Sequence, residues 1–286
     1  MTATALAERR RLFAAEIKTL ASLRTDALVS ALATIPREQF LPKGPWTLRS
    51  EADFGGPPRT SPDDDPRHVY DNVSVAIDAG RSLFNGAPAL VCRCIDALSL
   101  EPGARVLHVG CALGYYTAVI AHIVGPRGRV IAIEVDPNLA AGARLNLESM
   151  PWVEVQHGDA TAPLDASLDA ILVHAGVTHP RDAWLDALEA GGRLVLPLTA
   201  TLPGMGSMGK GLMMLLTRRS DGWFAAQTLT FVAIYSAIGL RDAALNQQIG
   251  LGLMKRQFAE TTWLRRDPHE PGAACRLHTD AFCLSA

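Results

Sequence analysis

The stretch Val106-Leu107-His108-Val109-Gly110-Cys111-Ala112-Leu113-Gly114-Tyr115 decides the fold class of this chain. Its first four residues are an apolar run typical of a buried strand, and small residues then form a turn before a helix. Such a turn lets the backbone approach a ligand closely. The stretch therefore predicts a cofactor site at the passage from strand to helix. The candidate contact residues are His108, Gly110, Ala112, Gly114 and Tyr115.

Short apolar runs alternate with helical segments after this stretch. We expect strands at 105–109, 130–134, 153–156, 170–173 and 193–196. Strands that alternate with helices at this spacing indicate βαβ units and a parallel sheet. Right-handed crossovers place the loops after these strands along one edge, where such sheets bind ligands. The predicted fold class is α/β, a doubly wound, Rossmann-like sheet that ends in a hairpin formed by 212–217 and 223–232.

Two acidic residues follow the glycine turn at informative positions. Glu134 ends the second strand, 20 residues after Gly114, where a carboxylate can accept both hydroxyls of a ribose; Val135 follows it. Gly158-Asp159-Ala160 follows the third strand and places a short acid where an adenine amino group could be bound. The plain alternatives are that Glu134 is a surface acid at a strand end and that Asp159 is a turn residue. The order of Glu134 and Asp159 after the glycine turn favours ligand contacts for both.

A nicotinamide dehydrogenase is the rival class for this pattern. That class uses Gly-x-Gly-x-x-Gly to wrap a pyrophosphate at a helix N-terminus. Here the turn reads Gly110-x-Ala112-x-Gly114, without the third glycine. S-adenosylmethionine carries no phosphate and needs no such cradle, so the sequence favours a methyltransferase.

Several ordered motifs resemble the protein-L-isoaspartate O-methyltransferase family. The segment 35–42 is similar to the family's VPRExFVP, 69–72 to its AYxD, and 80–83 falls where the family has GQTI. The segments 169–173 and 191–197 resemble its later core strands. The resemblance covers about residues 28–235. It implies a seven-stranded methyltransferase sheet, S-adenosyl-L-methionine as cofactor, S-adenosyl-L-homocysteine as product, and O-methylation of a carboxylate.

The chain also departs from that family at the substrate loop. The family's loop carries a serine thought to serve the substrate carboxylate, and this chain reads Ser82-Leu83-Phe84 there, with Phe84 in place of the serine. His108 replaces the family's acid before the first glycine, and Ala112 its middle glycine. We therefore expect methylation of a carboxylate on a peptide or small acid, not isoaspartyl repair. Ser82 and Phe84 are the candidate residues at the reacting carboxylate, although Phe84 would equally serve to pack the loop.

Two other functions stay open. A phenol or alcohol acceptor must lose its proton, and His174, directly after the strand at 169–173, is the candidate base as well as a candidate cofactor contact. A hydrogen-bonded structural histidine is the plainer interpretation. The other alternative is a non-catalytic scaffold that binds S-adenosylmethionine and recognises a partner through residues 200–286.

Composition excludes several classes. The chain has 286 residues, 48% hydrophobic content, 20% charged residues and a formal net charge of −2, which gives no electrostatic case for nucleic acid or an anionic membrane. No apolar stretch near the N-terminus is long enough for a signal peptide or a membrane span, so a cytoplasmic protein is expected. Cys275, His278, Cys283 and nearby His269 carry zinc-ligating atoms, but no Cys-x-x-Cys pair anchors them. The sequence therefore favours free thiols and no metal.

The expected organisation has three parts. Residues 1–80 hold N-terminal helices, from helical spacing over 6–32, and a Pro-, Gly- and Asp-rich loop at 42–68 that would act as a lid or lack order. Residues 81–235 form the methyltransferase core. Residues 236–286 form an extension with apolar residues at helical spacing, which we expect to be helical, and a homodimer through it stays open.

Overall fold

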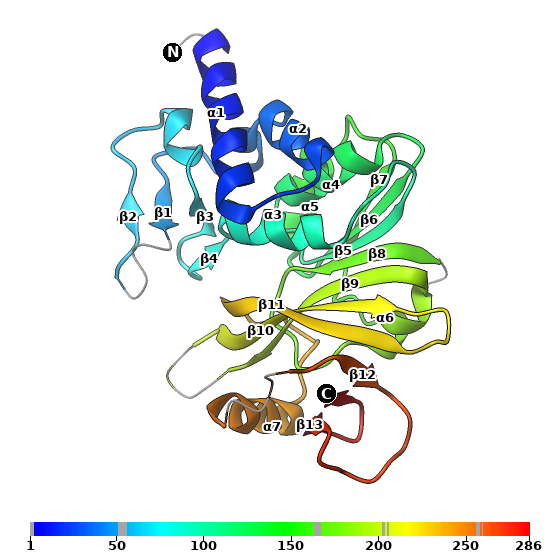
Figure 1. Cartoon of the computed structure of the whole chain (residues 1–286). Coiled ribbons are helices and arrows are strands. Elements are labelled where there is room, and N and C mark those ends of the chain that lie inside the picture. Colours follow the sequence, from blue (N-terminus) through cyan, green and yellow to red (C-terminus); the bar gives the residue numbers. More distant parts are fainter. Residues whose placement is uncertain are drawn as a thin grey trace. The chain divides into compact units, whose positions relative to one another are not determined.

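The computed structural model describes residues 3–50, 56–162, 167–201, 204, 206–255, 258 and 260–286 (Figure 1). The chain divides into two compact units. The first contains residues 1–103, 111–132 and 136–156, and the second contains 104–110, 133–135 and 157–286. Within the described residues, no helix is long and apolar enough to cross a membrane.

The first unit begins with two helices, α1 (Ala3–Ala21) and α2 (Asp26–Thr34). Phe13 and Ile17 of α1 and Leu28 and Leu32 of α2 are fully buried, as their helical spacing requires. Thr25 stands at the N-cap of α2 in an extended conformation but makes no side-chain capping bond. The two helices predicted over 6–32 are confirmed.

Five further helices of the first unit lie within its described residues. They are η1 (Arg37–Phe40), η3 (Pro66–Val69), α3 (Pro88–Ala97), α4 (Tyr115–Val124) and α5 (Pro137–Asn146). Helix α5 begins as the sequence indicates, because the Asp136 carboxylate accepts hydrogen bonds from the N–H groups of Asn138 and Leu139 and Pro137 occupies the first helical turn.

A small antiparallel sheet, in the order β2-β1-β3-β4, lies in the first unit. Its strands are β1 (Thr47–Ser50), β2 (Arg59–Thr60), β3 (Val73–Asp78) and β4 (Leu83–Phe84). The prediction of one long loop over 42–68, as a lid or a disordered insertion, is therefore wrong where the chain forms β1, β2 and η3. Residues 51–55 of that loop lie outside the described residues.

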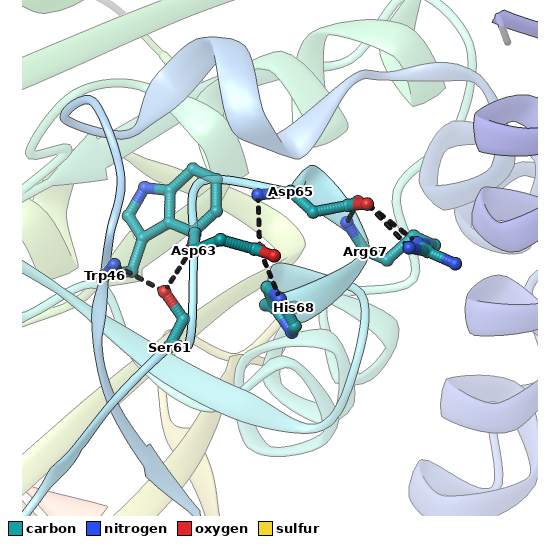
Figure 2. Close-up of polar contacts among 6 residues, drawn as sticks. All are labelled: Trp46, Ser61, Asp63, Asp65, Arg67 and His68. Carbon is teal, nitrogen blue, oxygen red and sulfur yellow. Dashed lines mark hydrogen bonds and ion pairs between the residues drawn. The ribbon is translucent and has the colours of Figure 1, made fainter. Parts of the chain in front are cut away.

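Side chains of this Pro- and Asp-rich segment stabilise it locally (Figure 2). The Ser61 hydroxyl accepts a hydrogen bond from the Trp46 N–H at 2.8 Å and donates to the Asp63 carbonyl at 2.8 Å. The Asp63 carboxylate in turn lies 2.8 Å from Nε2 of His68. Short polar side chains thus satisfy backbone groups that a sheet or helix would otherwise pair.

The main sheet has ten strands in the order β13-β14-β12-β11-β10-β9-β8-β5-β6-β7. Its strands are β5 (Arg105–Val109), β6 (Arg129–Glu134), β7 (Val153–His157), β8 (Leu168–Val173), β9 (Leu188–Ala200), β10 (Met208–Arg218), β11 (Phe224–Tyr235), β12 (Trp263–Arg265), β13 (Cys275–His278) and β14 (Cys283–Ser285). Strands β5, β8 and β9 pair in parallel, while β9, β10 and β11 pair antiparallel. The predicted doubly wound α/β fold and its closing hairpin are confirmed.

The C-terminal extension adds to this sheet instead of ending outside it. Helix α6 (Asp182–Ala187) precedes β9, and helix α7 (Ala243–Met254) follows β11. Strand β12 then pairs antiparallel with β11 and with β14. The seven strands β5–β11 form the expected methyltransferase sheet, and the extension adds three short strands beside β11. The extension is therefore only partly helical.

Candidate functional site

The carboxyl ends of four strands, β5, β6, β7 and β8, meet within the second unit, where a doubly wound sheet binds its ligand. The Gly110 N–H donates to the Ile133 carbonyl at 2.8 Å, and the His174 N–H donates to the Val109 carbonyl at 2.8 Å. The Gly158 N–H donates to the Glu134 carbonyl at 2.9 Å. The backbone thus brings the predicted residues Gly110, Glu134, Gly158 and His174 to one sheet edge.

The glycine turn has the conformation that small residues allow. Gly110 and Gly114 have φ of +79° and +93°, and Ala112 between them has φ of +51°. The Gly114 N–H donates to the Cys111 carbonyl at 2.9 Å, which closes the turn before α4. A Cβ on Gly114 would lie 2.8 Å from Cδ1 of Leu147, so this glycine also allows close packing against α5's C-terminal end.

The two predicted nucleoside acids differ in their surroundings. Glu134 is 7% exposed at the end of β6, and Val135 follows it. The Asp159 carboxylate accepts hydrogen bonds from the hydroxyl and N–H of Thr161 through Oδ1, and these bonds lower its pKa. A Cβ on Gly239 would lie 2.9 Å from its Oδ2, so Gly239 packs against this carboxylate. Ala160 has φ of +57° beside it.

Two histidines stack at the end of the parallel strands. The rings of His108 and His174 lie 5.9 Å apart with an interplanar angle of 22°. Burial lowers the pKa of His174 to about 4, and burial together with His174 lowers the pKa of His108 well below its ordinary range. Both imidazoles are therefore neutral at pH 7.

The predicted acceptor loop lies in the first unit. Ser82 is exposed in the turn between β3 and β4 with φ of +52°, and its N–H donates to the Ala79 carbonyl at 3.1 Å. Phe84 pairs with Ala76 in the sheet. The guanidinium carbon of Arg49, on β1, lies 4.9 Å from the centroid of the Phe84 ring. Arg49 Nε is buried and has no hydrogen-bond partner among the described residues.

Sequence reasoning missed Arg49, because an arginine in a Pro- and Gly-rich segment carries no periodic signal. It also missed the role of Arg37, which is fully buried. The Arg37 guanidinium donates to the carbonyls of Val69 at 2.6 Å and Val73 at 2.7 Å and to Oδ1 of Asn85 at 3.4 Å. The Pro-Arg-Glu segment thus anchors the loop that follows β4. With the Asp71 carbonyl at 3.4 Å, Arg37 donates to four acceptors and holds these segments together.

Tyr115 lies in the core of the first unit. It is 3% exposed, and its ring contacts Phe40 at 5.8 Å and Tyr116 at 5.0 Å between centroids. Burial raises the pKa of its phenol, so the hydroxyl stays protonated. Its assignment as a cofactor contact, like the other site assignments, stays a prediction.

The donor set of the second unit fits a nucleoside without a phosphate. A buried carboxylate ends β6, and a glycine with left-handed φ ends β5. At Gly158, a Cβ would meet no described atom within 4 Å, so the backbone there is open to an approaching ligand. Fold and site together define an S-adenosylmethionine-dependent methyltransferase.

Comparison with known proteins refines this class. Residues 59–236 match the family model of protein-L-isoaspartate(D-aspartate) O-methyltransferase. A protein-L-isoaspartate O-methyltransferase 2 of Pelobacter propionicus is 32% identical over 197 residues, which cover 68% of this chain and 76% of the relative. A protein-L-isoaspartate O-methyltransferase of Methanothrix thermoacetophila is 29% identical over 231 residues, which cover 79% of this chain and 96% of the relative. A solved protein-L-isoaspartate O-methyltransferase structure superposes with a TM-score of 0.64 at 21% identity, covering 88% of this chain and 71% of that one.

The chain belongs to the protein-L-isoaspartate(D-aspartate) O-methyltransferase family. It is an enzyme, and its cofactor is S-adenosylmethionine. The non-catalytic scaffold considered from the sequence is therefore set aside.

Proposed function

We propose that this enzyme forms a methyl ester on a carboxylate of a peptide or small acid and does not serve isoaspartyl repair. The observation that carries the proposal is the stacking of Arg49 on Phe84. Where the family has a serine hydroxyl, this chain has an aromatic face that holds a guanidinium. Arg49 is partly exposed, and its buried Nε has no hydrogen-bond partner among the described residues, so its guanidinium is suited to bind a carboxylate.

The chemistry needs little beyond binding and alignment. S-adenosylmethionine, when bound, supplies the electrophilic methyl group. A carboxylate with a pKa of about 4 is already ionised at neutral pH and needs no general base. Arg49 would hold one oxygen of the acceptor and leave the other free to attack. Alignment and exclusion of water then supply the rate enhancement.

The electrostatics of His174 favour a carboxylate over a phenol or alcohol acceptor. A hydroxyl acceptor requires a base whose pKa lies near the working pH. Burial lowers the pKa of His174 to about 4, so this imidazole would hold a proton poorly at pH 7. A neutral histidine at this strand end is better suited to line the cofactor site than to remove a proton.

The relatives are named for isoaspartate, so the acceptor has to be tested directly. Purified enzyme is incubated with methyl-labelled S-adenosylmethionine and with matched peptides that contain isoaspartate, aspartate or asparagine at one position. Mild base hydrolyses a methyl ester and releases the label as methanol. A methyl ether is stable in mild base and keeps the label. We expect base-labile label on a carboxylate without preference for isoaspartate over aspartate.

Selective labelling of the isoaspartyl peptide would refute the loss of repair activity. Base-stable label on a phenol would refute the carboxylate. The variant Phe84→Ser restores the family's serine and removes the face under Arg49. If the proposal is correct, it increases the ratio of isoaspartyl to aspartyl labelling while S-adenosylhomocysteine affinity stays unchanged.

A further inference from the structure

Four side chains with metal-ligating atoms converge in the C-terminal part of the second unit. They are His269, Cys275, His278 and Cys283, and each offers one ligand atom within 4.8 Å of the others. All four follow α7, around β13 and β14 (Figure 1). They also lie outside residues 59–236, the part that matches the family model.

A β-bulge places three of these side chains on one face. Strands β13 and β14 pair antiparallel, with His278 opposite Cys283 and Cys275 opposite Ser285. The register shifts between Cys275 and Leu277, where β13 contains one extra residue. Side chains of a regular strand alternate between faces, and one extra residue reverses that alternation. Cys275 therefore shares a face with His278, and both lie on the side of Cys283.

The fourth side chain comes from the loop before β13, and its partners orient it. Nδ1 of His269 lies 2.8 Å from the Asp267 carbonyl, which requires an N–H at Nδ1. The other ring nitrogen, Nε2, then carries a lone pair, and it lies 3.6 Å from Sγ of Cys275. A carbonyl that accepts from the non-ligating nitrogen is the usual outer partner of a metal-bound histidine.

Three further observations fit the same arrangement. The Gly272 N–H donates to Sγ of Cys275 at 3.3 Å, a contact that stabilises a thiolate. Nδ1 of His278 is buried and has no hydrogen-bond partner among the described residues. The rings of His269 and His278 contact edge to face with centroids 4.7 Å apart. Buried polar nitrogens normally have a partner, and a metal ion would provide it.

We propose that His269, Cys275, His278 and Cys283 bind one Zn²⁺ ion. Two nitrogen and two sulfur ligands form a closed tetrahedral set for zinc, in which ligand atoms are separated by about 3.3–3.8 Å. Small side-chain shifts from the observed separations, within 4.8 Å, reach that geometry. Two thiolates neutralise the charge of the ion.

The site is structural rather than catalytic, because four protein ligands leave no open position for water or substrate. It closes the loop between β12 and β13 and ties it to β14. Since β12 pairs with both β11 and β14, zinc fixes the added edge of the main sheet. The sequence indicated these four residues but favoured free thiols, because they lack a Cys-x-x-Cys pair and the bulge that aligns Cys275 with His278 cannot be read from their spacing.

The test measures metal in the full-length protein. Zinc is quantified by elemental analysis after purification without chelator, and after denaturation, reduction and refolding with one equivalent of Zn²⁺. We expect about one zinc per chain. Replacement by Co²⁺ should give the intense visible bands of a tetrahedral site and the ultraviolet charge-transfer band of thiolate ligation. Wild-type protein suffices for both measurements.

Variants then locate the ion. Cys275→Ser, Cys283→Ser and His278→Asn should each lose stoichiometric zinc, whereas Cys94→Ala, which removes a buried cysteine outside the cluster, should retain it. A chelator should lower the melting temperature of wild type and Cys94→Ala but not of Cys283→Ser. Zinc-free protein in both preparations would overturn the proposal. A disulfide between Cys275 and Cys283 would also overturn it. Mass spectrometry of the unreduced protein would show such a bond as a loss of two hydrogens, and peptide mapping would assign it to these two cysteines.

Discussion

The guanidinium carbon of Arg49 lies 4.9 Å from the centroid of the Phe84 ring, and these two residues come from different strands of the small sheet. The sequence singled out Phe84 but not Arg49. The proposed change of acceptor depends on this contact, because it brings a cation next to the residue that replaces the family's serine.

Arg49→Gln should weaken acceptor binding. Loss of a charge-assisted hydrogen bond costs about 1.5–3 kcal/mol, so we expect a roughly 10- to 100-fold lower kcat/KM, mainly through KM. The measurement is base-labile methyl transfer to the best carboxylate acceptor. Arg59→Gln is the matched control, because Arg59 is exposed on the neighbouring strand β2. Equal activity of both variants would contradict a role for Arg49.

Glu134→Gln should weaken cofactor binding. An amide has one acceptor oxygen and no charge, whereas a carboxylate presents one charged oxygen to each ribose hydroxyl. The expected loss is about 1.5–3 kcal/mol, or roughly 10- to 100-fold in Kd. Titration calorimetry with S-adenosylhomocysteine measures it. Glu154→Gln on β7, which removes an exposed partner of Arg129, should leave the affinity unchanged. Wild-type affinity in Glu134→Gln would disprove the ribose assignment.

Gly114→Ala should destabilise the first unit more than Gly103→Ala. Both glycines have similar φ, +93° and +92°, so both substitutions cost about 1–2 kcal/mol of backbone strain. At Gly114 the new Cβ would lie 2.8 Å from Cδ1 of Leu147. At Gly103 no described atom would lie within 4 Å of the new Cβ. This crowding should add about 1–3 kcal/mol. Urea unfolding compares the two variants, and equal losses would show that the turn relaxes freely.

Stability should fall as the pH is lowered through the window between the unfolded and folded pKa values of His174, from 6.5 to about 4. In this window the unfolded chain binds the proton and the buried imidazole does not, so acid favours unfolding. His174 should account for about 1–2 kcal/mol of the loss between pH 7 and pH 5.

Urea unfolding at both pH values measures this dependence without cofactor. His174→Gln should show a smaller loss between pH 7 and pH 5. His157→Gln, which removes an exposed histidine, should show the same loss as wild type. An unchanged pH dependence in His174→Gln would mean that the imidazole titrates normally.

Local sequence was sufficient for the parallel core and for the residues that follow its strands. Apolar runs specify buried strands, and glycine is favoured where φ is positive, so Gly110, Gly114 and Glu134 could be assigned to a sheet edge from order alone. The resemblance to the family's motifs indicated the cofactor and the class of reaction. Each of these signals is local or depends on a fixed order along the chain.

Tertiary structure decided what depends on contacts between distant segments. Arg49 meets Phe84 only because β1 and β4 both pair with β3. The zinc-ligating atoms converge only because a bulge in β13 and the pairing with β14 bring His269, Cys275 and Cys283 together. Register and bulges are set by the packing of whole strands, which the composition of a short segment does not encode.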